Sequence, residues 1–265
     1  GKTTTLKLAA GLLRRDSGLI EVFGVDPWVN CVEVRARIGL LHERPLYPEN
    51  VRVKDLLEFL AKLRGYGAEE ALRVARLVGL ENYMDYRVYH LSRGYLQRLG
   101  LAQALIGDPD LLLLDEPTAN LDPMARLEIL RLISALKREL KVTVIVSSHI
   151  IPELREVCDY AIFISGGVVT TYGPLEDLSK AFPVEAEYEV VTPTPRELAS
   201  RLVSEDFVKA VEIRDERLKV RVSGQGLEEF LRLIEEFRTK GSVLEIRHVG
   251  ADLGDLYARI IGSSG

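Results

Sequence analysis

Apolar residues form two kinds of pattern, helical spacing and short unbroken runs, along the first 180 positions of the chain. Helical spacing joins Val53, Leu56, Leu57, Leu60 and Leu63. Short unbroken apolar runs occupy 111–114 and 142–146. The first run, read by periodicity alone, fits either a helix or a strand. Pro109 before it and the acidic pair after it favour a buried parallel strand.

These patterns predict the order of elements in the first part of the chain. We expect helices at about 1–13, 53–63, 68–78, 94–106 and 122–140. We expect strands at about 20–23, 36–41, 111–114, 142–146, 160–164 and 168–172. Residues 48–106 then form a mostly helical block between strand-bearing regions. Alternating strands and helices predict an α/β fold with a parallel core sheet.

A second pattern follows a predicted boundary near residue 182. Its expected elements are strand 184–192, helix 195–203, strands 207–213 and 217–222, helix 226–239, strand 242–249 and helix 252–261. The order βαββαβ predicts a small α+β, ferredoxin-like domain over about 183–262. Residues 263–265 form a tail to which we assign no function.

Composition narrows the classes of protein. The 265 residues are 47% hydrophobic and 28% charged, which is typical of a globular chain with a sizeable core. The net charge is -5 and no Lys/Arg block stands out, which argues against a nucleic-acid partner. Two cysteines are too few for a disulfide framework and indicate a reducing compartment. No apolar stretch approaches the roughly 20 residues that span a bilayer, so any membrane role requires a partner.

The first candidate chemistry lies at the start of the chain, in Gly1-Lys2-Thr3-Thr4. Glycines let backbone N–H groups wrap phosphates, a lysine reaches the outer phosphates, and the next hydroxyl ligates Mg²⁺. A helix N-terminus adds favourable partial charge. The four residues alone are a weak signal, and taken without the rest of the chain they are better explained by a solvated helix start.

Asp115 and Glu116 carry a stronger signal. An apolar strand delivers both carboxylates to its C-terminal end, the edge at which open α/β sheets bind ligands. One can hold Mg²⁺ while the next faces an attacking water. A pair of solvated acids at a strand exit is the alternative.

Two further segments are weak signals by themselves and become informative when they are considered together with the other motifs. Ser92 reads as the N-cap of a helix, with Gly94 allowing close approach. His149 ends the second buried strand in Ser147-Ser148-His149 and could reach a γ-phosphate from the same sheet edge. A capping serine and a structural histidine are the alternatives.

Taken together and in order, GKTT, a Q-loop-like turn, LSRGY, LLLLDEP, ANLD and SSH resemble an ATP-binding cassette (ABC) ATPase over roughly residues 1–180. The resemblance implies a P-loop NTPase (RecA-like) parallel-sheet core over 1–182, with an inserted helical subdomain at about 48–106. It also implies a head-to-tail dimer that holds two ATP molecules at its interface, with ATP and Mg²⁺ as cofactors.

The resemblance assigns the nucleotide and metal site by motif position. Gly1, Lys2, Thr3 and Thr4 correspond to the end of the phosphate-binding loop, with Lys2 on the phosphates and Thr3 on Mg²⁺. Asp115 corresponds to the Mg²⁺-associated aspartate.

The remaining motif positions concern catalysis and the opposite subunit. Glu116 corresponds to the catalytic glutamate that polarises water, and His149 to the switch histidine on the γ-phosphate. Asp122 closes the D-loop, which communicates between the two sites. Ser92 and Gly94 correspond to the signature residues that touch the ATP held by the other subunit.

Four departures from the family pattern stand out. The chain begins at Gly1, so the first strands and upstream glycines are absent, and we expect the chain as given to bind ATP poorly. Arg93 replaces the first signature glycine, and Tyr95 stands where Gln or a similar residue is usual. Glu43 occupies the Q-loop position, where it can ligate Mg²⁺ but cannot donate as an amide does; a surface turn acid is the alternative.

Arg93, Glu43 and the second domain resemble the ABC-2 type exporter branch. Residues 184–261 look like its accessory domain, and 251–257 like that domain's usual ending. We therefore expect a homodimeric or heterodimeric transport ATPase, cytoplasmic and peripheral at the inner face of the cell membrane. It would couple ATP-driven closure to a membrane permease, which the turn 47–50 contacts. A soluble ABC ATPase acting on nucleic acid or ribosomes, a non-hydrolysing regulatory subunit and an importer are the alternatives.

Overall fold

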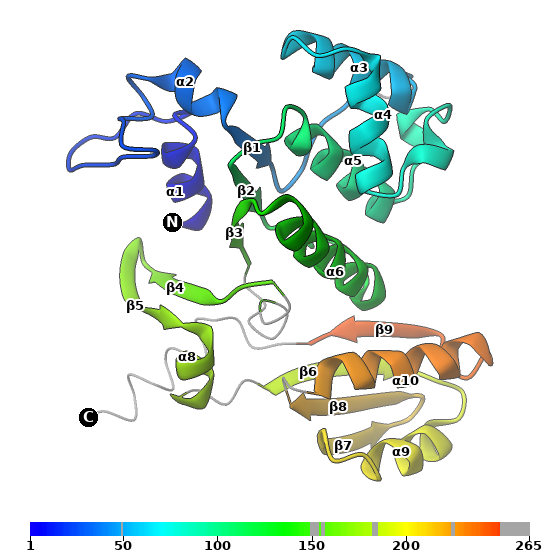
Figure 1. Cartoon of the computed structure of the whole chain (residues 1–265). Coiled ribbons are helices and arrows are strands. Elements are labelled where there is room, and N and C mark those ends of the chain that lie inside the picture. Colours follow the sequence, from blue (N-terminus) through cyan, green and yellow to red (C-terminus); the bar gives the residue numbers. More distant parts are fainter. Residues whose placement is uncertain (49, 149–153, 155–156, 182–184, 224–225, 250–265) are drawn as a thin grey trace. The chain divides into compact units, whose positions relative to one another are not determined.

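The computed structural model describes residues 1–48, 50–148, 154, 157–181, 185–223 and 226–249 (Figure 1). The chain divides into two compact units. The first contains Gly1–Leu121, Glu128–Ser148 and Gly166–Val168, and the second contains Asp122–Leu127, His149–Ser165 and Val169–Gly265. The domain boundary expected near residue 182 lies outside the described residues and stays a prediction.

A parallel three-stranded sheet forms the centre of the first unit. Its strands are β1 (Ile38–Leu41), β2 (Leu111–Asp115) and β3 (Thr143–Ser147), in the order β1-β2-β3. Every residue of β2 is buried, which confirms that the leucine run is a buried strand and not a helix. Since all three strands run the same way, their carboxyl ends meet at one edge.

Helices precede and separate these strands. They are α1 (Lys2–Ala9), α2 (Cys31–Ala36), α3 (Val53–Leu63), α4 (Ala68–Leu77), α5 (Arg93–Leu105) and α6 (Pro123–Leu140), with short 3₁₀ turns η1 (Glu81–Tyr83) and η2 (Val88–His90). The helical block predicted at 48–106 is confirmed by α3, α4 and α5, which lie together in Figure 1. Leu6 of α1 and Ala10, which caps the end of the helix, pack in one apolar cluster with Leu111 and Leu113, and this cluster holds α1 against the sheet.

The strand predicted at 20–23 is wrong. Val22 pairs only with Val25, as an isolated bridge. Phe23 and Gly24 between them both take left-handed backbone angles, with φ of 55° and 80°. The chain therefore turns back on itself before a strand can extend. The sequence analysis also missed α2, whose six residues are too few for a clear periodicity.

Gly39 brings β1 and α5 into backbone contact. A Cβ atom at this position would lie 2.0 Å from the carbonyl oxygen of Ala104 on α5, and 2.6 Å from a methyl group of Leu112. Real atoms do not approach so closely, so glycine is required for this spacing.

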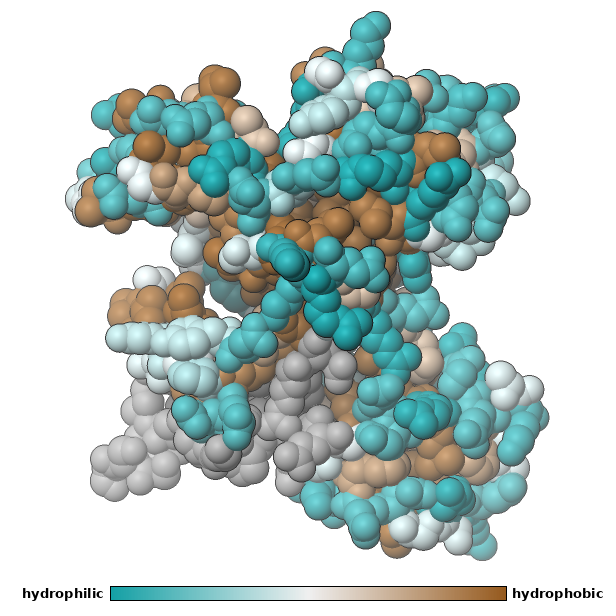
Figure 2. Space-filling model, viewed as in Figure 1, coloured by the Kyte–Doolittle hydropathy of each residue, from teal (hydrophilic) through white to brown (hydrophobic). Residues whose placement is uncertain are grey.

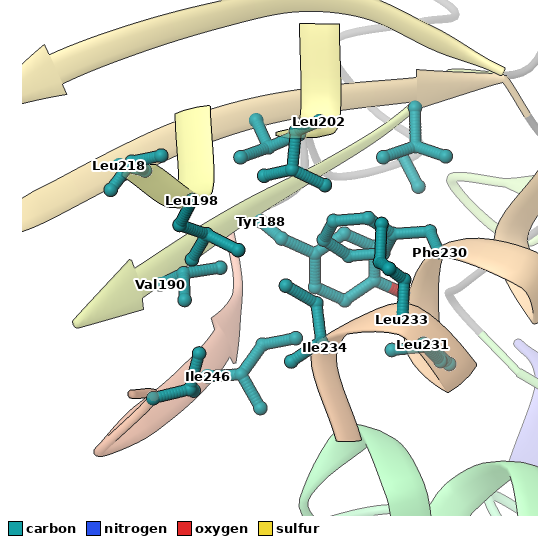
Figure 3. Packing of buried hydrophobic residues seen from close by; sticks show 14 of the residues in the cluster. Tyr188, Val190, Leu198, Leu202, Leu218, Phe230, Leu231, Leu233, Ile234 and Ile246 are labelled. Carbon is teal, nitrogen blue, oxygen red and sulfur yellow. The ribbon is translucent and has the colours of Figure 1, made fainter. Parts of the chain in front are cut away.

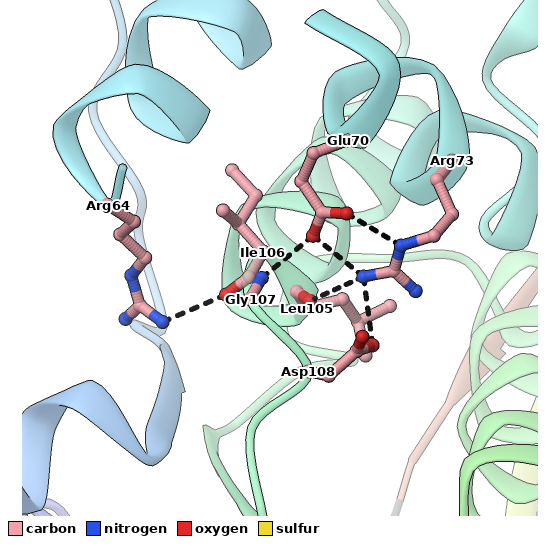
Figure 4. A network of polar contacts seen from close by, with 7 residues as sticks. All are labelled: Arg64, Glu70, Arg73, Leu105, Ile106, Gly107 and Asp108. Atoms are coloured by element: carbon pink, nitrogen blue, oxygen red, sulfur yellow. Dashed lines mark hydrogen bonds and ion pairs between the residues drawn. The ribbon is translucent and has the colours of Figure 1, made fainter. Parts of the chain in front are cut away.

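A buried acid secures the loop between α5 and β2 (Figure 4). Glu70, on α4, is 8% exposed and accepts two 2.7 Å hydrogen bonds from the Arg73 guanidinium and one from the Gly107 amide. Arg73 also pairs with Asp108 at 2.9 Å. Gly107 and Asp108 have left-handed φ angles of 83° and 48°. We call Glu70, Arg73, Gly107 and Asp108 the loop latch, because together they hold this turn at the entrance of β2.

Arg64 adds a second tie beside the loop latch. Its guanidinium donates to the carbonyl oxygens of Ile106 at 2.9 Å and Ile38 at 3.0 Å. One side chain at the end of α3 thus joins the end of α5 to the start of β1. The helical block is therefore bonded to the strands that carry the candidate site.

The second unit contains an antiparallel sheet built from β6 (Glu185–Val191), β7 (Val208–Arg214), β8 (Arg217–Ser223) and β9 (Glu245–His248), in the order β7-β8-β6-β9. Helices α9 (Pro195–Val203) and α10 (Leu227–Thr239) complete the order βαββαβ. This order and pairing confirm the expected ferredoxin-like arrangement. The helix predicted at 252–261 lies outside the described residues.

One side of this sheet holds an apolar core (Figure 3). Tyr188 and Phe230 are at most 1% exposed, with ring centroids 5.2 Å apart, and Val190, Leu198 and Ile234 pack around them. Hydrophilic residues dominate the visible surface of this sheet-and-helix domain in Figure 2. The unit also includes the two-stranded sheet of β4 (Tyr160–Ser165) and β5 (Val168–Pro174), as predicted, and α8 (Leu175–Ala181).

Among the described residues, no helix is both long enough and apolar enough to span a bilayer.

Candidate functional site

The predicted acidic pair lies at the carboxyl edge of the parallel sheet. Asp115 is the last residue of β2 and is only 4% exposed. It stands in register with Ser147, the last residue of β3. Glu116 follows at once, with a left-handed φ of 47° that turns the chain away from the strand.

Asp115 accepts hydrogen bonds from two hydroxyl groups. Thr3 Oγ1, in the first turn of α1, donates to Asp115 Oδ1 at 2.9 Å, and Ser147 Oγ donates to the same oxygen at 2.7 Å. The first bond joins residues that are 112 positions apart in sequence. The structure therefore brings the helix start and the β2 exit into one site.

Glu116 completes the cluster. Its carboxylate lies 3.1 Å from the Lys2 ammonium, measured from Oε1 to Nζ. Its amide donates to the Ser147 carbonyl oxygen at 3.1 Å and to Ser147 Oγ at 2.9 Å. Lys2 thus contacts Glu116 and Thr3 contacts Asp115, so two separate contacts join the start of α1 to the exit of β2.

The start of α1 suits an anion. Gly1 precedes the helix without a capping side chain, and Thr5 returns to the Gly1 carbonyl through both its amide and its hydroxyl at 2.9 Å. The amides of Lys2, Thr3 and Thr4 belong to the first turn, where a helix has no internal acceptors for them. Positive charge from Lys2 adds to this polarity.

The site fits a hard divalent cation. Thr3 Oγ1 and Asp115 Oδ1 are oxygen donors 2.9 Å apart, and oxygen ligands of this kind are what Mg²⁺ takes, usually with waters and phosphates as further ligands. Glu43 lies just beyond the end of β1, at the same sheet edge. Its ion pair is with its neighbour Arg44 at 3.4 Å, and the described residues show no contact from it to Thr3 or Asp115. Its metal role stays a prediction.

The signature residues open α5. Ser92 is the N-cap, and its Oγ accepts from the Tyr95 amide at 3.4 Å. Gly94 lies in the first turn. Arg93 Nη1 donates to the Asn120 carbonyl oxygen at 3.3 Å, which joins the signature segment to the D-loop of the same chain. Tyr95, the unusual residue, hydrogen-bonds through its hydroxyl to the Tyr83 hydroxyl at 2.8 Å.

Asp122 caps α6. Its Oδ1 accepts from the amides of Met124 at 3.1 Å and Ala125 at 3.0 Å. The described contacts therefore show a capping role, and the catalytic role implied by the D-loop stays a prediction. His149 lies outside the described residues.

The turn at 47–50 has an unexpected inward side. The Tyr47 hydroxyl is buried and has no hydrogen-bond partner among the described residues, and burial raises the pKa of this phenol. Gly100 on α5 leaves room for it. Leu46, just before the turn, is 94% exposed, and Pro48 and Asn50 within the turn are exposed as well.

Sequence reasoning missed the part played by Ser147. The sequence motif places Ser147 only at a strand end, whereas in the structure its hydroxyl donates to the Asp115 carboxylate and accepts from the Glu116 backbone amide. A polar residue at the end of a buried strand, in register with an acidic one, was the available signal.

A sequence model for the ABC transporter family matches residues 1–119. A second, for an AAA domain described as a putative AbiEii toxin of a type IV toxin–antitoxin system, matches residues 85–156. Both matches include the start of β2 and the helix before it.

Curated relatives match at high identity. The ABC transporter ATP-binding protein NatA of Bacillus subtilis is 39% identical over 67% of this chain and 74% of its own length. The Nod factor export ATP-binding protein I of Burkholderia lata is 34% identical over 99% of this chain and 84% of its own length. The bacitracin transport ATP-binding protein BcrA of Bacillus licheniformis is 38% identical over 68% of this chain, which spans 59% of that protein.

Solved structures agree with these matches. CbiO1 of Clostridium perfringens, described as part of the ABC transporter complex cbiONQ, superposes with a TM-score of 0.62 and 27% identity. The superposition covers 68% of this chain and 75% of that one.

Proposed function

This chain belongs to the ABC transporter family, and from that premise we propose that it binds and hydrolyses ATP to drive a membrane permease. The observation that carries the proposal is the contact of the Asp115–Glu116 pair with Lys2 and Thr3. Phosphoryl transfer from ATP needs groups of these kinds: two carboxylates, here at the end of β2, and a cation and a hydroxyl, here at the start of α1.

Each residue has a chemical task in this proposal. Lys2 and the α1 amides bind the outer phosphates through charge and hydrogen bonds. Thr3 and Asp115 hold Mg²⁺, which when bound neutralises charge on the phosphate oxygens. The hydrogen bonds that Asp115 accepts from the Thr3 and Ser147 hydroxyls fix its carboxylate in position for binding the metal ion.

Glu116 acts on the attacking water. A carboxylate beside the phosphate site accepts a hydrogen bond from water and orients its lone pair toward the γ-phosphorus. The 3.1 Å contact with Lys2 places this carboxylate next to the phosphate-binding cation. His149 is assigned to the γ-phosphate by motif position alone.

The assembly follows the family pattern. Two such subunits close head to tail on ATP, with Ser92 and Gly94 of one contacting the nucleotide of the other. Their position at the N-terminus of α5 suits that contact, because a helix start attracts phosphate. The names of the relatives in Bacillus licheniformis and Burkholderia lata, which concern bacitracin transport and Nod factor export, favour an exporter that works at the cytoplasmic side of the cell membrane.

The test is Glu116→Gln in the full-length protein. We expect ATP turnover to fall by about 100-fold or more, because the amide cannot accept a proton from water, while ATP-dependent dimerisation persists. Phosphate release and light scattering measure the two properties.

Glu139→Gln is the matched control. Glu139 is an exposed residue of α6, so the same change there should leave turnover intact. Near wild-type turnover in Glu116→Gln would contradict the role given to Glu116.

A further inference from the structure

One serine hydroxyl touches both members of the acidic pair. Ser147 ends β3 and is 6% exposed. Its Oγ donates to Asp115 Oδ1 at 2.7 Å and accepts from the Glu116 amide at 2.9 Å. A hydroxyl has one proton to give and lone pairs to receive, so both bonds can exist at once.

We propose that Ser147 is a positioning residue for the ATPase reaction, fixing the Asp115 carboxylate and the Glu116 backbone together. The inference rests on the proposed function and adds to it a residue that the motif roles leave without a task. The chain of bonds runs in one direction, from the Glu116 N–H to Ser147 Oγ, and from the Ser147 proton to Asp115. Because each bond polarises the next, the two are stronger together than apart.

The Asp115 end of this chain fixes a carboxylate orientation. Oδ1 receives hydroxyl protons from opposite parts of the fold, Thr3 on α1 and Ser147 on β3. If the Thr3 hydroxyl served as a metal ligand, the Ser147 hydroxyl would still hold the same carboxylate oxygen. Removal of the serine hydroxyl would leave Asp115 without its second tether.

The Glu116 end fixes a backbone conformation that glutamate rarely adopts. A residue with a φ of 47° needs surrounding contacts to hold it. The Ser147 carbonyl oxygen accepts from the Glu116 amide at 3.1 Å, a bond that any residue at position 147 could make. The additional 2.9 Å bond to Oγ requires a hydroxyl. Ser147 thereby links the aim of the Glu116 side chain to the position of Asp115.

The register of the sheet makes this arrangement specific. Asp115 and Ser147 are paired residues of adjacent parallel strands. A shift of one residue would point the hydroxyl to the opposite face of the sheet. The pairing of β2 with β3 therefore carries the geometry of the acids, and not only the strength of the sheet.

The experiment compares Ser147→Ala, Ser147→Thr and Thr143→Ala in the full-length protein. Thr143 is an exposed hydroxyl residue at the other end of the same strand and serves as the matched control. For Ser147→Ala we expect kcat to fall on the order of 10- to 100-fold, as small misplacements of reacting groups do, with the KM for ATP changed by less than about 2-fold. The Mg²⁺ concentration for half-maximal turnover should rise.

A readout without turnover accompanies the kinetics. Hydrogen exchange of a peptide covering 111–121, in which the Glu116 amide lies well inside the peptide, should be faster in Ser147→Ala in the absence of nucleotide, because this amide loses a hydrogen bond. Ser147→Thr keeps the hydroxyl and should restore both the exchange rate and kcat. Thr143→Ala should match the wild type in both.

The outcomes separate this inference from the proposed function. If the wild type does not hydrolyse ATP, or if Glu116→Gln turns over normally, the proposed function fails. If the wild type hydrolyses ATP and Glu116→Gln does not, but Ser147→Ala keeps the wild-type kcat and exchange rate, only the role of Ser147 fails. Ser147→Thr as slow as Ser147→Ala also overturns it, since the hydroxyl would then not be the cause.

Discussion

Acidic side chains serve the two units in different ways. In the first unit Asp115 and Glu70 are at most 8% exposed, and each accepts several hydrogen bonds from fixed donors. In the second unit Glu187 and Glu189 stand on the partly exposed side of β6 and pair with basic residues of β8, as in the 2.7 Å contact of Glu189 with Arg217. Acidic residues are thus buried and held by hydrogen bonds in the first unit, and are partly exposed in surface ion pairs in the second.

Physical cost explains the difference. A buried carboxylate is unfavourable unless its oxygens find donors, so each one in the first unit has a defined set of partners. In an exposed ion pair the two charges replace contacts with water by a contact with each other, so the pair adds little to the free energy of unfolding. We therefore expect the second unit to depend on its apolar core for stability, and the first unit to depend on a few buried polar contacts as well.

Phe230→Ala should give the largest effect, and it sharpens the comparison from the apolar side. Phe230 is fully buried beside Tyr188, so its truncation should cost about 3–5 kcal/mol of local stability. Hydrogen exchange of the β6 and β8 amides measures this loss. Phe59→Ala, at a phenylalanine that is 58% exposed, should cost little; equal effects would mean that burial is not the deciding variable.

Glu70→Gln tests the buried acid of the loop latch and should have an intermediate effect. The amide cannot form the charged pair with Arg73, and a lost hydrogen bond to a charged group costs about 1.5–3 kcal/mol. Urea denaturation followed by the fluorescence of Trp28, the single tryptophan, measures it. An unchanged midpoint would show that the latch adds nothing to stability.

The effect of Glu70 should also depend on pH. The Arg73 guanidinium, with the Gly107 amide, holds the pKa of Glu70 below its ordinary value. A lowered pKa in the folded state means that the stabilisation is complete above the ordinary pKa of about 4.3 and is lost as pH falls through the folded value. The stability gap between the wild type and Glu70→Gln should therefore narrow below about pH 4. A gap that stays constant down to pH 3 would contradict this.

Glu189→Gln should give the smallest effect. Its partner Arg217 is more than half exposed, and pairs of this kind contribute roughly 0–1 kcal/mol. Hydrogen exchange of β6, at low and high salt, measures the change. A loss as large as that of Glu70→Gln would break the distinction between buried and exposed acids.

Much of this architecture could be predicted, because hydrophobic spacing records burial. The leucine run of β2 and the alternation of β6, in which Ala186, Tyr188 and Val190 face the core, follow directly from it. The error at 20–23 arose because an apolar run does not show that Phe23 and Gly24 reverse the chain.

The site was predictable to the same depth. Parallel strands end at one edge, so residues at the exit of β2 and the start of α1 could be expected to meet. The two hydrogen bonds of the Ser147 hydroxyl could not be predicted, since they depend on the register of β2 with β3 and on the direction of one hydroxyl proton. Arg93 likewise gave no sign in sequence that it reaches Asn120.

Gly39 has a mechanical consequence. At position 39 the backbone of β1 packs directly against the backbone of α5 at Ala104, because glycine places no side chain between them. Even a single methyl group at position 39 would therefore force α5 and the sheet apart.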